Sequence, residues 1–141
     1  MNFTKSKKVV LVGGCFDVLH PGHVIFLEKA KKAGDKLVVL LESDEKVKKL
    51  KGVKRPVHNQ DERVQVLLAL KSVDEVIKLP FIETEREYDE IIKKIKPDII
   101  ATAKGYENSH HHERSAKKVG AKIKYVTKII GNHSTSRILS R

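Results

Sequence analysis

Apolar residues in this chain occur in short runs of valine, leucine and isoleucine that are bounded by glycine, proline or charged residues. Such runs are typical of strands that are covered on both faces of a parallel sheet. They predict five strands, over residues 9–12, 36–41, 75–79, 98–102 and 122–126.

The segments between these runs carry apolar residues at intervals of three and four, which places those residues on one face of a helix. Tyr88, Ile92 and Ile95 have this spacing. Pro97 follows them and Gly120 follows a later segment, and both residue types end helices. The pattern predicts helices over residues 21–33, 44–49, 61–70, 85–95, 113–119 and 134–139.

Strands that alternate with helices form parallel βαβ units with right-handed crossovers. We therefore predict an α/β fold: a single Rossmann-like doubly wound parallel sheet of five strands in the order 3-2-1-4-5, in one domain over residues 1–141. In this order the winding reverses between strands 1 and 4, and ligands bind at the carboxyl ends of the strands there. The candidate site therefore includes the segments that follow these two strands, 13–23 and 103–106.

The first of these segments reads Gly-Gly-Cys-Phe-Asp-Val-Leu-His-Pro-Gly-His over residues 13–23. Pro21 suits the first turn of a helix, so we expect a strand, a glycine turn and a helix N-terminus. Free N–H groups and the helix dipole favour a phosphate at such a point. His20 and His23 can donate hydrogen bonds to charge that develops on a phosphoryl group. The alternative is that they only cap the helix, a role that suits one histidine better than a pair.

The pattern Gly-x-Phe-Asp-x-x-His-x-Gly-His, which begins at Gly14, resembles the signature of the cytidylyltransferase-like nucleotidyltransferases, relatives of the class I aminoacyl-tRNA synthetases. The resemblance implies that an acceptor phosphate attacks the α-phosphorus of a nucleoside triphosphate and that pyrophosphate leaves. It implies that His20 and His23 stabilise the α-phosphate, without an enzyme nucleophile. Around the nucleotide it places Gly13, Gly14, Cys15, Phe16, Asp17 and Gly22.

Two residues of this segment keep alternative roles. Asp17 can orient His20, hold a metal-bound water or brace the loop. Cys15 is a conceivable thiol nucleophile, but the implied reaction needs no covalent step, so we expect a small buried residue whose N–H contacts phosphate.

A basic loop is expected over residues 51–60. It can fold over a triphosphate, with Gly52 as the hinge and Lys51 and Lys54 neutralising the leaving pyrophosphate. Lysines in a loop are more often only solvated, but the resemblance favours the phosphate role. The resemblance implies that Lys51 is a catalytic residue. The match of Lys54 is weaker, because the loop is about one residue longer here than in the glycerol-phosphate enzymes.

Arg63 and Asp44 each have a functional and a structural interpretation. Arg63 can contact a phosphate of the nucleotide or form a salt bridge on its own helix. Asp44 can contact the acceptor substrate or cap the helix that follows it.

Near the end of the chain, the stretch His133-Ser134-Thr135-Ser136-Arg137 either caps a terminal helix or offers its N–H groups to a phosphate. The stretch resembles the closing Ile-Ser-Thr-Thr motif of the same family, with His133 in place of the usual apolar residue. The resemblance implies nucleotide binding by Ser134, Thr135, Ser136 and Arg137.

The identity of the substrates depends on a shorter stretch. Lys104-Gly105-Tyr106-Glu107 is similar to the Lys-Gly-Gly-Asp of the adenylyltransferase domain of heptose-phosphate enzymes in lipopolysaccharide-core biosynthesis. The resemblance implies that Lys104 and Gly105 bind the nucleotide. It favours ATP with bound Mg²⁺ over CTP, a small phosphorylated acceptor such as a sugar 1-phosphate, and a homodimer.

Three alternatives remain open. Glycerol-3-phosphate cytidylyltransferases show Gly-Asp-Asp at this point. Archaeal FAD synthetases, which are FMN adenylyltransferases, share features of 43–52, although this chain lacks their cysteine-bearing tail. A nucleotide- or nucleic-acid-binding module without turnover is the third, and the presence of both histidines and both lysines argues against it.

Composition narrows the class of partner. The formal net charge of +11 indicates a polyanion, either nucleic acid or a nucleoside triphosphate. With no tryptophan and only 5% aromatic residues, base-stacking platforms are scarce, which argues against nucleic acid. One cysteine cannot form an internal disulfide, and no segment has the pattern of a signal peptide or membrane span, so we expect a cytoplasmic protein without a membrane partner.

The three consecutive histidines at 110–112 suggest a metal site at first sight. Consecutive residues do not converge on one face of a helix or strand, so we expect no metal site here. We expect instead a mobile loop at the mouth of the pocket.

Overall fold

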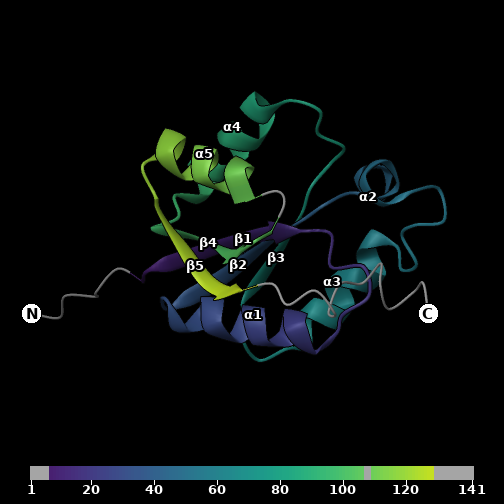
Figure 1. The fold of residues 1–141 in the computed structure, drawn as a ribbon, viewed down its shortest axis with the longest axis horizontal. Coiled ribbons are helices and arrows are strands. Elements are labelled where there is room, and N and C mark those ends of the chain that lie inside the picture. The colour runs from purple at the N-terminus through teal and green to yellow at the C-terminus, as the bar shows by residue number, and fades with distance from the viewer. Residues whose placement is uncertain (1–6, 107–108, 129–141) are drawn as a thin grey trace, which may run out of the picture.

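The computed structural model of this chain describes residues 7–106 and 109–128. Five parallel strands form one sheet in the order β3-β2-β1-β4-β5 (Figure 1), which confirms the predicted fold class and strand order. The elements are β1 (Val9–Gly14), α1 (Pro21–Lys32), β2 (Lys36–Leu41), α2 (Asp44–Lys51), α3 (Gln60–Leu68), β3 (Glu75–Lys78), α4 (Glu85–Ile95), β4 (Ile99–Lys104), α5 (Ser109–Val119) and β5 (Lys122–Lys128).

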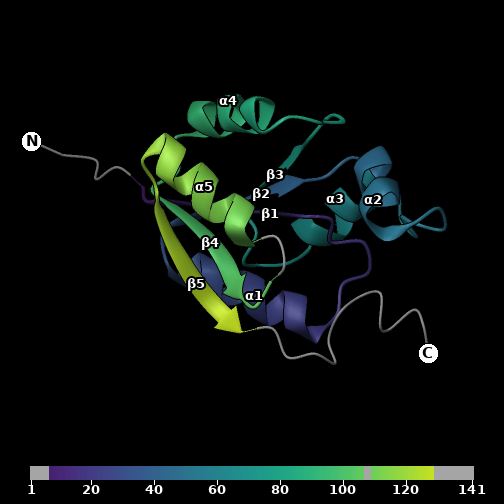
Figure 2. The same ribbon diagram turned by 45° about the horizontal axis from the view of Figure 1, so that its top comes forward.

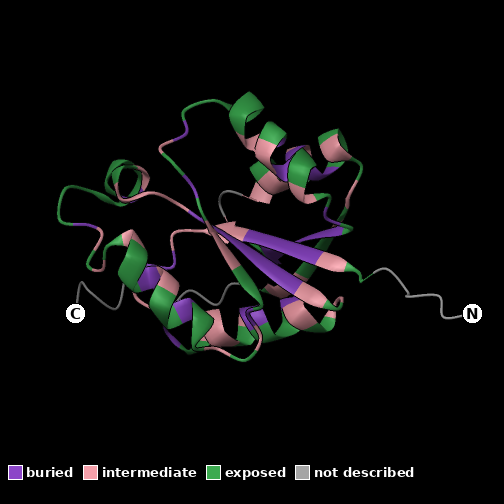
Figure 3. Ribbon diagram, turned by 180° about the vertical axis from the view of Figure 1, so that it is seen from behind, coloured by how far each residue is buried: buried purple, intermediate pink, exposed green. Residues whose placement is uncertain are grey.

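Helices cover both faces of the sheet. In Figures 1 and 2, α1 and α3 lie on one face and α4 and α5 on the other, while α2 lies beyond the carboxyl ends of the strands. Successive side chains of a strand point to opposite faces, so β1 contributes to two cores. Val10 and Val12 pack with Leu27 of α1, whereas Leu11 packs with Ile92 of α4. Figure 3 shows the buried residues concentrated in the central strands.

This topology determines where a ligand can bind. The connection from β1 through α1 leads to β2, whereas β4 pairs on the opposite side of β1. The carboxyl ends of β1 and β4 therefore border the point where the winding reverses, the position at which doubly wound sheets bind ligands.

Two element boundaries differ from those predicted in ways that affect the site. β1 continues through Gly13 and Gly14, which pair with β2, so the turn begins at Cys15. α2 is capped by Ser43, whose hydroxyl accepts from the N–H of Lys46, and continues to Lys51. Lys51 is therefore the last helical residue and not part of the loop.

The prediction of a mobile loop over the three histidines is wrong. Ser109–Val119 form one helix, α5, and all three histidines lie in its first half. Contacts between elements hold them there: His111 lies 3.4 Å from the carboxylate of Glu85 on α4, and His112 bonds to Thr102 on β4. The predicted terminal helix, 134–139, lies outside the described residues. In the described ranges, no helix has both the length and the apolar composition of a membrane span.

Candidate active site

His20 and His23 form a reciprocal cap at the start of α1. His20 is the N-cap residue, and its Nδ1 accepts a hydrogen bond from the N–H of Gly22 at 3.1 Å. The Nδ1 of His23 accepts in turn from the N–H of His20 at 3.3 Å. The two rings stack with centroids 3.9 Å apart. The expectation that a pair of histidines suits a helix cap poorly is therefore wrong, because both take part in this capping box.

The cap determines which ring nitrogen carries the proton. A backbone N–H can only donate, so the Nδ1 atom of each imidazole must be the acceptor. In the neutral ring the proton then resides on Nε2. Burial, together with the nearby His20 and Lys51, lowers the pKa of His23 from 6.5 to about 4, so this ring is neutral at pH 7. The cap thus directs the proton of each neutral ring to Nε2, at the positive end of a helix dipole.

Phe16 packs against the ring of His23. Its ring meets the ring of His23 edge to face, with centroids 5.6 Å apart, and is buried in the core. A methyl group on Gly14 would lie 3.0 Å from this ring, so the ring would have to move by a few tenths of an ångström to accommodate it. Phe16 itself has a φ of 43°, a left-handed conformation that side chains rarely adopt. The segment therefore positions the histidine, and Phe16 acts on the site through His23.

Asp17 braces the loop after α2. Its buried carboxylate lies 2.6 Å from Nε of Arg55 and also accepts from the N–H groups of Val57 and His58. Although burial opposes it, these donors together lower the pKa of Asp17. Among the roles that the sequence left open, bracing is the one with bonds to support it. The carboxylate ties the glycine-histidine segment to the far end of the basic loop.

Arg63 is buried in the frame of the site, with 1% of its surface exposed. It donates to the carbonyl oxygens of Cys15 at 2.7 Å and His58 at 3.0 Å, and its guanidinium pairs with Asp44 at 2.7 Å. These partners lie on other segments, so the predicted salt bridge within its own helix is wrong. The predicted phosphate contact has no support either, because the guanidinium faces the protein.

Asp44 is the first residue of α2, and Ser43 supplies the cap. Its bond to Arg63 joins α2 to α3 and to the segment after β1. Asp44 lies beside an open hollow on α2 and the loop, away from the cavity described below. Contact with the acceptor therefore remains a prediction.

The two predicted lysines differ in their surroundings. Lys51 ends α2 and lies near enough to His23 and Cys15 for its positive charge to favour a lower pKa of each side chain, although the pKa of Cys15 is raised overall. Gly52 follows with a φ of +113° and open space around it, so the chain turns sharply there. Lys54 is exposed on the loop beyond. The structure thus brings Lys51, but not Lys54, to the histidines.

Cys15 is half-buried beside these residues. Burial and the carboxylate of Glu42 raise the pKa of its thiol, against the opposing effect of nearby cations. A thiol with a raised pKa is protonated at neutral pH and is a poor nucleophile. Its surroundings therefore agree with the expectation that no covalent step involves Cys15.

The other predicted nucleotide contacts lie partly outside the described residues. Lys104 is the exposed last residue of β4, and Gly105 follows with a φ of +86° in open space. Both border the carboxyl end of β4, as predicted. Ser134, Thr135, Ser136 and Arg137 fall outside the described ranges.

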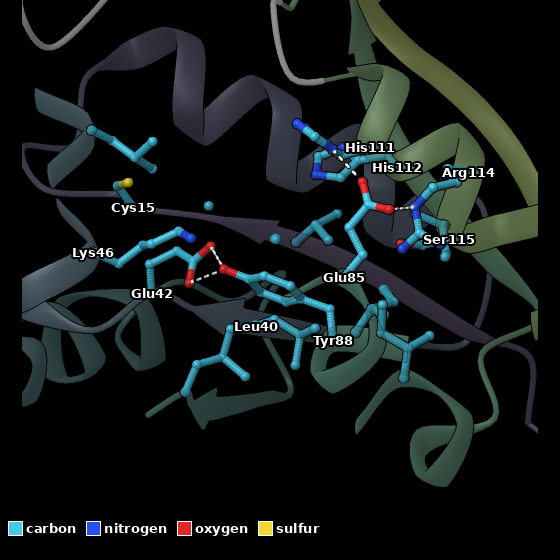
Figure 4. Close-up of a pocket in the computed structure, with 18 of the residues that line it drawn as sticks. Cys15, Leu40, Glu42, Lys46, Glu85, Tyr88, His111, His112, Arg114 and Ser115 are labelled. Carbon is cyan, nitrogen blue, oxygen red and sulfur yellow. Dashed lines mark hydrogen bonds and ion pairs between the residues drawn. The ribbon is translucent and has the colours of Figure 1, made fainter. Parts of the chain in front are cut away.

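A cavity of about 240 Å³ lies on the other side of β1, between the sheet and helices α4 and α5. Figure 4 shows its polar side chains facing one another. The Tyr88 hydroxyl donates to both carboxylate oxygens of Glu42, at 2.8 and 3.0 Å, and burial raises the pKa of Glu42. Lys46 and His112 complete this part of the wall. Gly13 and Gly14 at the end of β1 and Cys15 of the turn also line the cavity.

Sequence reasoning identified none of Glu42, Tyr88 and His112. They come from β2's end, α4 and α5, and no local motif connects them. The one available signal was Tyr88, a polar-tipped residue on the apolar face of α4. In the residues that the structure describes, no group of three or more histidine, cysteine or acidic side chains is arranged to hold a metal ion.

Comparison with known proteins identifies a family and similar proteins for this chain. The sequence model of the cytidylyltransferase-like family matches residues 11–139. The bifunctional protein HldE of Aliarcobacter butzleri is 41% identical over 133 residues, which cover 94% of this chain and 26% of that protein. HldE of Haemophilus influenzae is 44% identical over 102 residues, 72% of this chain and 21% of that protein. The chain thus spans only about a quarter of the length of these curated relatives.

Two solved structures have a similar fold. The lipopolysaccharide core biosynthesis protein from Thermoplasma volcanium aligns with a TM-score of 0.72 and 27% identity, over 89% of this chain and all of that one. Pantoate-β-alanine ligase from Francisella tularensis aligns with a TM-score of 0.63 over 99% of this chain and 67% of its own, at 18% identity. The second likeness concerns the fold alone.

Proposed function

The chain belongs to the cytidylyltransferase-like family of nucleotidyltransferases, and on that premise we propose that it transfers the adenylyl group of ATP to a sugar phosphate. A phosphate oxygen of the acceptor attacks the α-phosphorus. The bond from the α-phosphorus to the bridging oxygen breaks, and pyrophosphate leaves with the electron pair. No enzyme nucleophile takes part, so catalysis consists of positioning and charge stabilisation.

The observation that carries this proposal is the reciprocal cap formed by His20 and His23. It holds both rings by Nδ1 and keeps the proton on Nε2, the atom from which each ring can donate to an oxygen of the α-phosphate. Because the rings are fixed before the substrate arrives, the donors need no reorganisation when charge develops on the phosphate. The helix N-terminus adds its positive dipole at the same point.

Lysine charge would neutralise the leaving group. Lys51 lies close to His23, so an α-phosphate at the imidazoles would have its β- and γ-phosphates within reach of the lysine. Lys54 joins it if the loop beyond Gly52 folds inward. The nucleotide enters as its magnesium complex, with Mg²⁺ bound to the triphosphate oxygens as part of the substrate. Lys104, Gly105 and the segment from Ser134 to Arg137 would contact the remainder of the nucleotide.

The choice of a sugar phosphate has two supports. The stretch that begins at Lys104 is similar to the heptose-phosphate enzymes, and a similar solved structure is a lipopolysaccharide core biosynthesis protein. The proposal extends to the cytoplasm as the compartment and to a homodimer as the assembly. Sedimentation at several protein concentrations tests the assembly directly.

The test of the proposed function is pyrophosphate release from ATP and from CTP, each with Mg²⁺. The acceptors are a heptose 1-phosphate, a hexose 1-phosphate, glycerol 3-phosphate and FMN. We expect release with ATP and a sugar phosphate. Release with CTP and glycerol 3-phosphate, or with ATP and FMN, would keep the reaction class and overturn the substrates. Nucleotide binding without release from any pair would favour a binding module.

A further inference from the structure

The cavity beside β1 is chemically distinct from the histidine site. Val12, Gly13 and Gly14 separate the two, because the cavity lies on the face of α4 and α5 while the histidines begin α1 on the other face. Beyond the end of β1, the turn that begins at Cys15 lies between the cavity and the histidine site, and Cys15 lines the cavity. A ligand seated in the cavity can therefore reach the α-phosphate position across a segment with little side-chain bulk.

The walls of the cavity are largely apolar, but they carry three carboxylates, those of Glu42, Glu83 and Glu85. The opposing cations are partly engaged: Arg114 pairs with Glu85 at 3.0 Å and with Asp89, and Lys46 donates to the carbonyl oxygen of Ile82. With three carboxylates against Lys46 and Arg114, this wall has no excess of positive charge to attract a polyanion. The N-terminus of α1 with Lys51 is therefore the better site for a triphosphate.

The same walls match hydroxyl groups. Glu42 is held by the Tyr88 hydroxyl with one lone pair of each oxygen and keeps the others to accept from a ligand hydroxyl. His112 bonds to Thr102 through Nδ1 at 2.9 Å, which turns Nε2 toward the end of β1. A methyl group placed on Gly13 would lie 4.0 Å from this nitrogen.

His112 also discriminates between ligand groups by its protonation. Burial, together with His110 and His111, lowers its pKa to about 4, so the ring is neutral at pH 7. Whichever nitrogen carries the proton, a hydroxyl can donate to Nε2 or accept from it, whereas a phosphate oxygen can only accept. A neutral imidazole beside carboxylates is thus suited to a sugar hydroxyl.

Size points the same way. The cavity has a volume of about 240 Å³, which is below the roughly 300–1,000 Å³ of pockets that enclose drug-sized ligands. A single sugar ring suits this volume better than the tricyclic ring of FMN.

From these observations we propose that the cavity is the acceptor site and that Glu42, Tyr88 and His112 select a hydroxyl-rich monophosphate such as a sugar phosphate. The inference rests on the proposed function and adds the residues that choose the acceptor. The sugar ring lies against Glu42 and His112, and its phosphate points past Gly14 toward the nucleotide.

The test uses the full chain and measures steady-state pyrophosphate release with a heptose 1-phosphate or a hexose 1-phosphate. In Glu42→Gln and His112→Gln we expect the acceptor KM to rise at least tenfold while the KM for ATP stays within twofold. Two matched controls lie on exposed positions: His110→Gln on the same helix as His112, and Glu90→Gln on α4. Both should leave both constants unchanged.

Binding of the same sugar phosphate, measured by calorimetry without nucleotide and with a non-hydrolysable ATP analogue, provides a second readout. If wild-type chain turns over the acceptor but neither variant raises its KM or weakens its binding, the acceptor-site inference is overturned and the proposed function stands. If wild type binds the sugar phosphate in a manner sensitive to His112→Gln but releases no pyrophosphate, the proposed function fails, and only the assignment of the cavity as a sugar-phosphate site stands. If no sugar phosphate binds under either condition, the inference is wrong.

Discussion

Two regions flank the carboxyl end of β1 and differ in charge, in the source of their residues and in what they can bind. On one side, His20 and His23 at the start of α1 and Lys51 at the end of α2 present donors and positive charge. On the other side, the cavity presents the carboxylates of Glu42, Glu83 and Glu85 with the neutral ring of His112. A segment of the chain containing two glycines is all that separates them.

The difference suggests a division of labour between the two faces. A triphosphate and a phosphorylated acceptor are both anionic, so a site that attracted either one everywhere would not orient them. A donor-rich face and a carboxylate-rich face hold the two substrates in opposite orientations, with only the reacting phosphates meeting near the turn. Preorganised placement of this kind can supply much of the rate enhancement in phosphoryl transfer.

The largest expected effect comes from removing one imidazole donor while keeping the helix cap. Asparagine is a favoured N-cap residue, so His20→Asn retains an acceptor for the N–H of Gly22 but lacks the Nε2–H group. We expect kcat to fall by about 10²–10³-fold, the usual loss for one preorganised donor. Thermal unfolding should change little. The measurement is pyrophosphate release alongside a melting curve.

His20→Ala is the matched comparison, because it removes both the cap and the donor. It should lose the same activity and about 1 kcal/mol of stability in addition. If His20→Asn were as active as wild type while His20→Ala was impaired, His20 and His23 would only cap the helix. The region at the start of α1 would then have no catalytic role.

Breaking the buried pair of Asp17 and Arg55 should lower the free energy of unfolding more than breaking an exposed ion pair does. Asp17→Asn removes the charge that faces a buried guanidinium and loses one of the acceptor positions for Val57 and His58. We expect the free energy of unfolding in urea to fall by about 3 kcal/mol. The exposed pair of Lys78 and Asp61 offers a control, since Asp61→Asn should cost less than about 1 kcal/mol. Equal losses in the two variants would refute the bracing role.

The two lysines of the donor-rich face should differ. Lys51→Met keeps the length and helix propensity of the side chain but removes its charge, and we expect kcat to fall by about 10–100-fold because charge on the leaving pyrophosphate is no longer neutralised. Lys54→Met, at an exposed position, should have a smaller effect. The assay is the same pyrophosphate release at saturating ATP. A larger loss in Lys54→Met would mean that the loop, and not the end of α2, carries the charge.

A smaller effect concerns pH. The pKa values of His23 and His112 are about 4 in the folded chain, while the unfolded chain protonates these rings near 6.5. Between these values the unfolded state binds more protons, so stability should fall as the pH drops from 6.5 to 4, by about 2 kcal/mol for each ring at pH 4.5. Urea unfolding at pH 7, 5.5 and 4.5 measures this slope.

The variant with His112→Gln should lose about half of this slope, and with His23→Asn added most of it should disappear. A wild-type chain whose stability is the same at pH 6.5 and 4.5 would contradict the neutral state assigned to both rings.

The fold and the donor-rich face could be predicted because their signals are local. Apolar runs with helical segments between them determine the strand order, and the histidines lie within one short segment that begins a helix. What the sequence could not indicate depends on distant partners. Arg63 bonds to Cys15, a residue 48 positions earlier, so it was open to other interpretations. Arg55 bonds to Asp17, 38 positions earlier, and no local pattern indicates this pair.

The acceptor side was missed for the same reason. Glu42 meets Tyr88 across 46 positions, and no pattern in either segment indicates the other. His112 was assigned to a mobile loop, whereas its bond to Thr102 and the ion pairs of Arg114 with Asp89 and Glu85 hold α5 against β4 and α4. Tertiary contacts, and not the local sequence pattern, therefore determine that this segment is helical.

Attack by an acceptor phosphate on the α-phosphorus of ATP can be tested directly. ATP labelled at the α-phosphate is incubated with Mg²⁺, the chain and a sugar 1-phosphate, and the products are separated, with ATP labelled at the γ-phosphate in a parallel reaction. We predict that the α label appears in a nucleotide sugar and the γ label in pyrophosphate. Transfer of the γ label to the sugar phosphate, or an α label that stays in ATP with every acceptor, would contradict the account.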